Sequence, residues 1–254
     1  MQKLAPFATI RHALDAVIQF RATGIRIGLP WSLALAVISF LDHTFFSVPQ
    51  TADTETNLMI FRPADLIIAG ISLVIFSSIA VNWHRYILLD EVTAPEKLFR
   101  LDRPVWNYAL RTLLIMIIAL VPVLIFSAIF IAALPRFSLL LAVPFFLAGI
   151  YIMRMSVALP AMALERSDFG VRDALRITQG NNLQFAALLA LNTLILLTTF
   201  FVLGIMLTII GSVSLTGAKF MAIVLSVPVN IFLSLFSVSL LSSLYGFFVE
   251  QRKF

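Results

Sequence analysis

The sequence predicts an all-α fold, a polytopic bundle of about six transmembrane helices with both termini on the cytoplasmic side. The first observation is composition: 61% of the residues are hydrophobic and 12% are charged, against about 45–50% and about 25% in soluble domains. A soluble chain of 254 residues could not hide that much apolar surface, whereas a bilayer solvates it from outside. Long apolar runs and the distribution of basic residues are the second and third observations.

Six runs reach the length of about 20 mostly apolar residues that a membrane crossing needs. They cover residues 27–45, 64–82, 109–132, 138–159, 184–210 and 220–248. Because these runs use most of the chain, we expect a single integral membrane domain over 1–254, without a separate soluble enzyme. Charged residues interrupt segment 1–26, which is therefore not expected to be a signal peptide.

The basic residues predict the orientation. With the N-terminus inside, the inner segments hold 15 of the 18 Lys and Arg residues. The outer segments hold only Arg62, Arg136 and Lys219. Cytoplasmic loops carry an excess of Lys and Arg, so this distribution favours cytoplasmic termini. The three tryptophans fall at the predicted inner interface, where an indole ring is stable: Trp31, Trp83 and Trp106.

The net charge of +5 would suggest a nucleic-acid partner in a soluble protein. In a membrane protein, basic residues at the inner face lie beside anionic lipid. We therefore expect membrane phospholipids as partners and no nucleic acid. Protein partners and oligomeric state are not predicted.

An amphipathic inner segment precedes each pair of predicted spans, at 6–26, 94–108 and 168–179. The first carries apolar residues at helical spacing: Phe7, Ile10, Leu14, Val17 and Ile18. In the second, Thr93 can cap a helix that Pro104 ends; in the third, Ser167 or Asp168 can cap a helix that stops at Gly180. Such helices lie in the membrane interface or pack on the inner ends of the spans, and both readings stay open.

A short match supports an internal repeat. "IRHAL" at 10–14 and "VRDAL" at 171–175 share Arg, Ala and Leu, and each lies in an inner segment that precedes a span pair. The chain thus reads as three units of inner helix, span, outer turn and span, over approximately 6–82, 94–159 and 168–248.

The stretch "RMSVALPAMALERSDFGVRDALRITQGNN" (154–182) resembles bacterial inner-membrane proteins of the glycerophosphodiester phosphodiesterase membrane-domain-like and YciC-like group. The matching features are Arg154 near a span end, Leu159–Pro160, Ser167 heading a helix, and Thr178, Gly180 and Asn181. "NWHRYILLDE" (82–91) resembles short membrane proteins of alphaproteobacteria. The resemblance implies six helices in a bacterial inner membrane. It implies no hydrolysis, because the catalytic domain of the fused relatives is absent.

Three arginines form a candidate lipid head-group site. Arg154 lies about one turn inside the fourth span, where a long side chain can snorkel to the interface. The functional reading is a phosphate contact by Arg154 together with Arg85 and Arg176, because guanidinium groups bind phosphate with two hydrogen bonds. An ion pair of Arg154 with Asp90 or Glu91 is a third reading.

Polar residues on the last two spans form a candidate seam. Ser226, Asn230 and Ser234 share one face of the sixth span, and Asn192 lies on the fifth. Packing between helices explains such residues, and a polar path for a transported substrate is the alternative. A hydrated cavity lined by Asn192, Ser226 and Asn230 would support the transport reading.

The sequence offers no signature of an enzyme. It has no Cys, its histidines (His12, His43 and His84) lack metal-ligand spacing, and it contains no phosphate-binding loop or nucleophile motif. We therefore expect no metal, no cofactor and no enzymatic activity. The leading expectation is a role in membrane lipid or envelope homeostasis through inner-leaflet contact. The alternative is a transporter or channel for lipids or small molecules.

Overall fold

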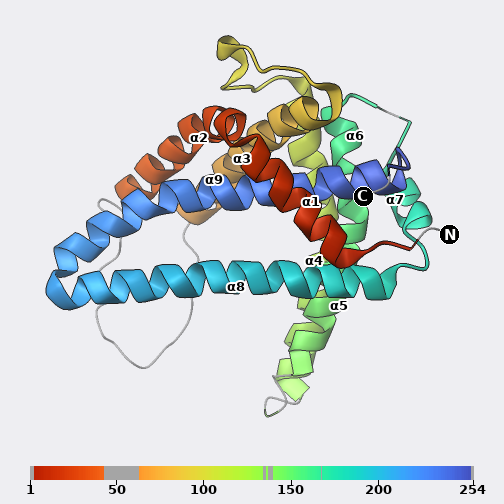
Figure 1. Cartoon of the computed structure of the whole chain (residues 1–254). Coiled ribbons are helices and arrows are strands. Elements are labelled where there is room, and N and C mark those ends of the chain that lie inside the picture. The colour runs from red at the N-terminus through yellow and green to blue at the C-terminus, as the bar shows by residue number, and fades with distance from the viewer. Residues whose placement is uncertain (1–2, 43–62, 134–135, 137–139, 167, 253–254) are drawn as a thin grey trace.

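The computed structural model describes residues 3–42, 63–133, 136, 140–166 and 168–252 (Figure 1). In this part of the chain the predicted all-α fold is confirmed, with α-helices, 3-10 turns such as η2 (Pro95–Lys97) and no strand. The α-helices are α1 (Pro6–Gln19), α2 (Arg21–Leu41), α3 (Pro63–Leu89), α4 (Arg103–Ala133), α5 (Ala142–Ser156), α6 (Leu159–Ala163), α7 (Val171–Ile177), α8 (Asn182–Val213) and α9 (Leu215–Phe248). His43, Arg62, the cap Ser167 and most of the first outer loop lie outside the described residues.

Six helical segments are long and apolar enough to cross a membrane, as predicted. They are Arg21–Leu41, Pro63–Leu89, Arg103–Ala133, Ala142–Ala163, Asn182–Val213 and Thr216–Phe248. Several extend further at their predicted inner ends than the apolar runs do; α3 continues to Leu89 rather than ending at 82. The reason is that polar side chains there, such as His84 and Arg85, bond to neighbouring elements, which hydropathy alone does not register.

The fourth predicted span is broken between α5 and α6. The N–H of Val157 and that of Ala158 bond three residues back, to the carbonyls of Arg154 and Met155. These tight bonds end α5. Pro160 then lies in the first turn of α6, a position where its missing N–H costs little.

Buried side chains gather at one end of the bundle, which we call the basal end. It holds α1, α6, α7, the starts of α2, α4 and α8, and the ends of α3, α5 and α9. For example, the fully buried residues of α8 are Phe185 and Leu188, both in its first two turns. From the basal end the α4–α5 and α8–α9 hairpins extend in different directions, and both chain ends lie near it (Figure 1). Away from it, apolar side chains are exposed along the helices, as lipid contact requires.

Helix α1 packs across the basal ends of α9 and α8. Its buried face holds Ile10, Ala13 and Val17. Two residues of the predicted apolar stripe lie elsewhere, since Phe7 is 76% exposed and Ile18 is 61% exposed. One face of α1 thus packs on spans, and a second apolar strip faces outward. The predicted helix 6–26 is divided, because α1 ends at Gln19 and α2 begins at Arg21.

The predicted helix over 94–108 is wrong. Residues 94–102 form a loop with the short turn η2, and α4 begins at Arg103 with Pro104 in its first turn. The loop is held by side chains of two spans: Trp31 Nε1 donates to the Leu98 carbonyl at 3.0 Å, and Asn82 Nδ2 donates to the Lys97 carbonyl at 3.1 Å. These bonds satisfy carbonyls that a helix would otherwise use, so Pro104 starts a helix instead of ending one.

The third inner segment does form a helix, α7, although a shorter one than 168–179. Its N-cap is Gly170, whose N–H donates to the Asp173 carboxylate at 3.0 Å. The stop signal is confirmed, because Gly180 has a φ of 79°, which glycine adopts without strain. With α7 helical and 94–102 a loop, the three-unit repeat stays a prediction.

Helices α2 and α9 approach each other closely at two glycines. A Cβ atom at Gly24 would lie 2.5 Å from Leu235 Cδ1, and one at Gly28 would lie 3.2 Å from Ile231 Cγ2. The spacing of four residues places both glycines on one face of α2, the small-residue pattern that lets membrane helices approach. This glycine pair was not predicted from the sequence.

Candidate functional site

Arg154 binds the C-terminal end of α7. Its guanidinium donates to the Leu175 carbonyl at 2.8 Å, to Thr178 Oγ1 at 3.0 Å and to Asn182 Oδ1 at 2.9 Å. The last carbonyls of a helix lack partners within the helix and carry partial negative charge, so a cation is stabilised there. In the described chain no carboxylate pairs with Arg154, and the third sequence reading, an ion pair with Asp90 or Glu91, is wrong because Glu91 binds Arg85.

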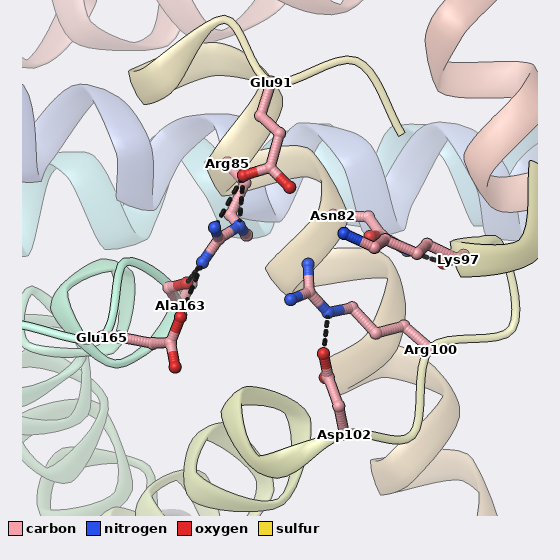
Figure 2. A network of polar contacts seen from close by, with 8 residues as sticks. All are labelled: Asn82, Arg85, Glu91, Lys97, Arg100, Asp102, Ala163 and Glu165. Atoms are coloured by element: carbon pink, nitrogen blue, oxygen red, sulfur yellow. Dashed lines mark hydrogen bonds and ion pairs between the residues drawn. The ribbon is translucent and has the colours of Figure 1, made fainter. Parts of the chain in front are cut away.

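Arg85 binds the end of α6 in the same manner. Its Nη1 donates to the Ala163 carbonyl at 3.2 Å and to Glu165 Oε2 at 3.2 Å, while Nε and Nη2 both lie 2.7 Å from Glu91 Oε2. Figure 2 shows the guanidinium between the two carboxylates. Two spans, α3 and α5, therefore each carry an arginine that fastens a short helix across the basal end.

Residues with left-handed backbone conformation position both carboxylates, those of Glu165 and Glu91. Glu165 has a φ of 58° and closes α6 in a Schellman motif, in which the Arg166 N–H donates to the Ala161 carbonyl at 2.9 Å. Asp90 has a φ of 54° and places Glu91 directly after α3. Glycine is the usual residue in this conformation. The sequence signal for these turns was absent, because neither position holds glycine.

A second cluster lies beside the first (Figure 2). The Arg100 side chain is buried, and its Nε donates to Asp102 Oδ2 at 2.6 Å. Because this arginine and Lys97 lie near Glu91, they add to the positive field around that carboxylate. The loop between α3 and α4 thus brings two cations, Lys97 and Arg100, and four carboxylates to the basal end.

A polar cavity of about 280 Å³ opens next to this cluster. It is lined by Arg103, Asn107, Met162, Glu165 and Arg166. Arg166 donates to the Tyr245 hydroxyl at 3.0 Å, which raises the pKa of Arg166, and it lies 3.6 Å from Glu250. Arg103 is exposed, and its guanidinium forms no hydrogen bond or ion pair with another residue of the described ranges. The cavity therefore presents one arginine whose charge has no protein partner.

The predicted head-group residues do not converge on one cavity. Arg85 and Arg154 are directed at helix ends, whereas Arg176 is 77% exposed and lies 3.7 Å from Asp173. Arg154 and Arg176 do lie near each other, since Arg154 donates to a carbonyl in the last turn of α7 and Arg176 belongs to that turn. Sequence reasoning missed Arg103 and Arg166, whose only signal was their place in inner loops among many other basic residues.

The predicted polar seam is dispersed. Asn230 is exposed, Ser234 is half-buried, and Ser226 donates within its own helix to the Ile223 carbonyl. Asn192 Oδ1 is buried without a hydrogen-bond partner among the described residues. None of the described cavities is lined by Asn192, Ser226 or Asn230.

The polar contacts of α9 lie further along that helix, at Ser239, Ser242 and Ser243. These hydroxyls bond to Trp83 Nε1, His84 Nδ1 and His12 Nδ1, each at 2.8 Å. Ser242 already donates to the Val238 carbonyl, so its oxygen accepts from the Nδ1–H of His84. This serine row joins α1, α3 and α9, and it is a packing feature of the kind that polar residues supply between membrane helices.

Comparison with models of known protein families, with curated proteins and with solved structures finds no match to this chain. The resemblance to the glycerophosphodiester phosphodiesterase membrane-domain-like group therefore stays an expectation.

The Arg85–Glu91 pair makes a pH-dependent contribution to stability. The hydrogen bond from Arg85 holds the pKa of Glu91 below its ordinary value of 4.5. A lowered pKa contributes stability that is present above pH 4.5 and is lost as the pH falls through the folded-state value. We expect Glu91→Gln to lower the free energy of unfolding by about 0.5–1 kcal/mol at pH 7. In detergent unfolding curves its deficit should shrink below pH 4; a constant deficit would contradict the assignment.

Proposed function

We propose that this protein is a non-enzymatic component of a bacterial inner membrane that acts in lipid or envelope homeostasis by binding phospholipid head groups of the inner leaflet. The observation that carries the proposal is the polar cavity lined by Arg103, Asn107 and Arg166 at the basal end. Arg103 offers an uncompensated guanidinium there, and phosphate is the anion that guanidinium groups bind with two hydrogen bonds.

The neighbouring groups suit a lipid head group. The Glu165 carboxylate, which would repel phosphate, is engaged by Arg85. The Asn107 amide can donate to a phosphate oxygen or accept from a glycerol hydroxyl. In this proposal Arg85 and Arg154 hold α6 and α7 in place, and the exposed Arg176 adds positive charge to the same surface.

The orientation is part of the proposal. The basal end carries the basic residues of the predicted inner segments, and anionic lipid of the cytoplasmic leaflet attracts Lys and Arg. If the basal end lies at the cytoplasmic surface of the membrane, the cavity is at the depth of the lipid head groups and both chain ends are in the cytoplasm. The exposed apolar faces of the hairpins then lie in the acyl region.

Native mass spectrometry with defined lipids tests the proposal. We expect wild-type protein to retain phosphatidylglycerol in preference to phosphatidylcholine, and Arg103→Gln with Arg166→Gln to lower that retention about tenfold, the loss of one charged hydrogen bond. Arg11→Gln with Arg136→Gln is the matched control, because it also removes two arginines, both exposed and both outside the lining of the cavity. Equal retention by the double variant and the control would contradict the proposal.

A further inference from the structure

Two apolar cavities follow the contact between α2 and α9. The first, of about 390 Å³, is lined by Val17, by Arg21, Ile25 and Leu29 of α2, and by α9 from Val227 to Leu235. The second, of about 590 Å³, is lined by α2 from Leu33 to Phe40 and by α9 from Ile223 to Pro228. Both cavities touch Val227 and Pro228, so together they form one groove, which we call the α2–α9 groove.

The two glycines of α2 explain the shape of this groove. At Gly24 and Gly28 the absence of side chains lets α9 approach, so that Leu235 and Ile231 form the floor. Beyond Gly28 the residues of α2 that line the groove all carry side chains, and the second cavity lies between Leu33 and Phe40 of α2 and Val224 of α9. In Figure 1, α2 and α9 run alongside each other in this region. Each cavity falls in the range of about 300–1,000 Å³ that suits small ligands.

Arg21 is the cation of the groove. It is the first residue of α2, at the basal end, and it is exposed. No hydrogen bond or ion pair joins its guanidinium to another residue of the described chain. The remaining lining of both cavities is aliphatic or aromatic: Val, Leu, Ile, Phe, Ala and Pro side chains. The groove therefore has one charged end and one long apolar body.

We propose that the α2–α9 groove binds one acyl chain of an anionic phospholipid of the inner leaflet, with the lipid phosphate on Arg21. The charge at one end and the apolar body match the two parts of such a lipid. From Arg21 to Phe40 the helix rises about 28 Å at 1.5 Å per residue, close to the full hydrocarbon thickness of about 30 Å. A chain that spans one leaflet therefore fits within the groove.

This inference deepens the proposed function, because it names a lipid site apart from the head-group cavity. The two sites also contact different parts of the lipid. The cavity at Arg103 and Arg166 recognises only the polar part of a lipid, whereas the groove recognises the acyl chain too. Variants that separate charge from groove volume can therefore test the two sites independently.

The experiment uses full-length protein in liposomes that contain phosphatidylglycerol or phosphatidylcholine with a photoactivatable diazirine in one acyl chain, followed by peptide mapping. We expect phosphatidylglycerol to label α2 and α9 around Leu29 and Pro228, about half a hydrocarbon thickness from Arg21. Arg21→Gln should reduce this labelling about tenfold and remove the preference over phosphatidylcholine. Ile25→Trp with Leu29→Trp should abolish labelling of the groove by both lipids, because the indoles fill the cavity next to Arg21.

Two controls match these variants. Arg172→Gln removes an exposed arginine of α7 and keeps the same net charge as Arg21→Gln. Val202→Trp adds an indole to an exposed position of α8 outside the groove. Both should leave labelling of α2 and α9 unchanged. Thermal unfolding of each variant checks that the groove-filled protein is folded, as expected for the exposed positions Ile25 and Leu29.

Three results would overturn the inference: labelling spread evenly over α8 and the groove, equal labelling in the groove-filled variant and the Val202→Trp control, or a dimer that the groove-filled variant dissociates. The last would make the groove an interface between copies. Arg103→Gln with Arg166→Gln should keep groove labelling. If Arg21→Gln leaves groove labelling unchanged while the double variant still loses phosphatidylglycerol retention, the groove site is lost and the proposed function stands. If Arg21→Gln lowers groove labelling while the double variant keeps full retention, the groove stands and the cavity is removed.

Discussion

Replacing Arg154 with Met is expected to lower the free energy of unfolding by about 3 kcal/mol. The guanidinium donates to three acceptors at the junction of α7 and α8, and a methionine of similar length leaves the Leu175 carbonyl and the Asn182 amide without that donor. Each charged hydrogen bond contributes about 1.5–3 kcal/mol, which desolvation of the buried cation partly offsets. Denaturant unfolding in detergent micelles would measure the change.

Arg172→Met is the matched control, because Arg172 is exposed on α7, the helix whose C-terminal end Arg154 binds. Arg154→Lys should recover only part of the loss, since one ammonium group cannot reach three acceptors arranged around a planar guanidinium. If Arg154→Met unfolds like the wild type but no longer retains anionic lipid, the structural role is contradicted. Arg154 would then be a head-group ligand, as the sequence suggested.

Gly24→Leu is expected to destabilise the protein by about 3 kcal/mol, at the upper end of the usual range for overpacking. The first carbon of the new side chain would lie 2.5 Å from Leu235 and 3.3 Å from the Trp83 ring. Leu235 can turn its terminal carbon toward the cavity that it lines, whereas the Trp83 ring is fully buried and is held by Ser239 Oγ. The helices α2 and α9 must therefore separate, and the Trp83–Ser239 hydrogen bond is strained with them.

Fluorescence of Trp83, in a background with Trp31 and Trp106 replaced by Phe, would report this separation as a red shift together with a lower unfolding midpoint. Gly70→Leu is the control, because no atom lies within 4 Å of the Cβ position at Gly70. Equal unfolding midpoints for the two variants would show that the close approach of α2 and α9 does not determine stability.

Sequence reasoning succeeded where a single physical quantity decides the outcome. Bilayer thickness sets the length of a span, and six apolar runs of that length gave six observed helices. The stop at Gly180 was predictable for the same reason, since the backbone conformation there favours glycine.

The site could be predicted less well, because the roles of its residues depend on contacts with residues that are far away in the sequence. The N–H of Leu4 bonds to Asn181, and Trp31 bonds to Leu98. The loop around η2 is non-helical because two spans hold its carbonyls, which no local pattern records. Similarly, Arg154 looks like a snorkelling residue in sequence, and only the fold shows that the end of α7 lies within its reach.

The packing of α1 on α9 has a consequence for biosynthesis. His12 and Ser243 bond to each other across 231 positions of the chain, so α1 is translated long before its partner exists. At about 5–20 residues per second this interval lasts roughly 10–50 s. During that time Ile10, Ala13 and Val17 need another apolar environment, and the surface of the membrane into which the spans insert provides it. The bundle can close at its basal end only after the last helix has emerged from the ribosome, when α1 exchanges lipid for protein.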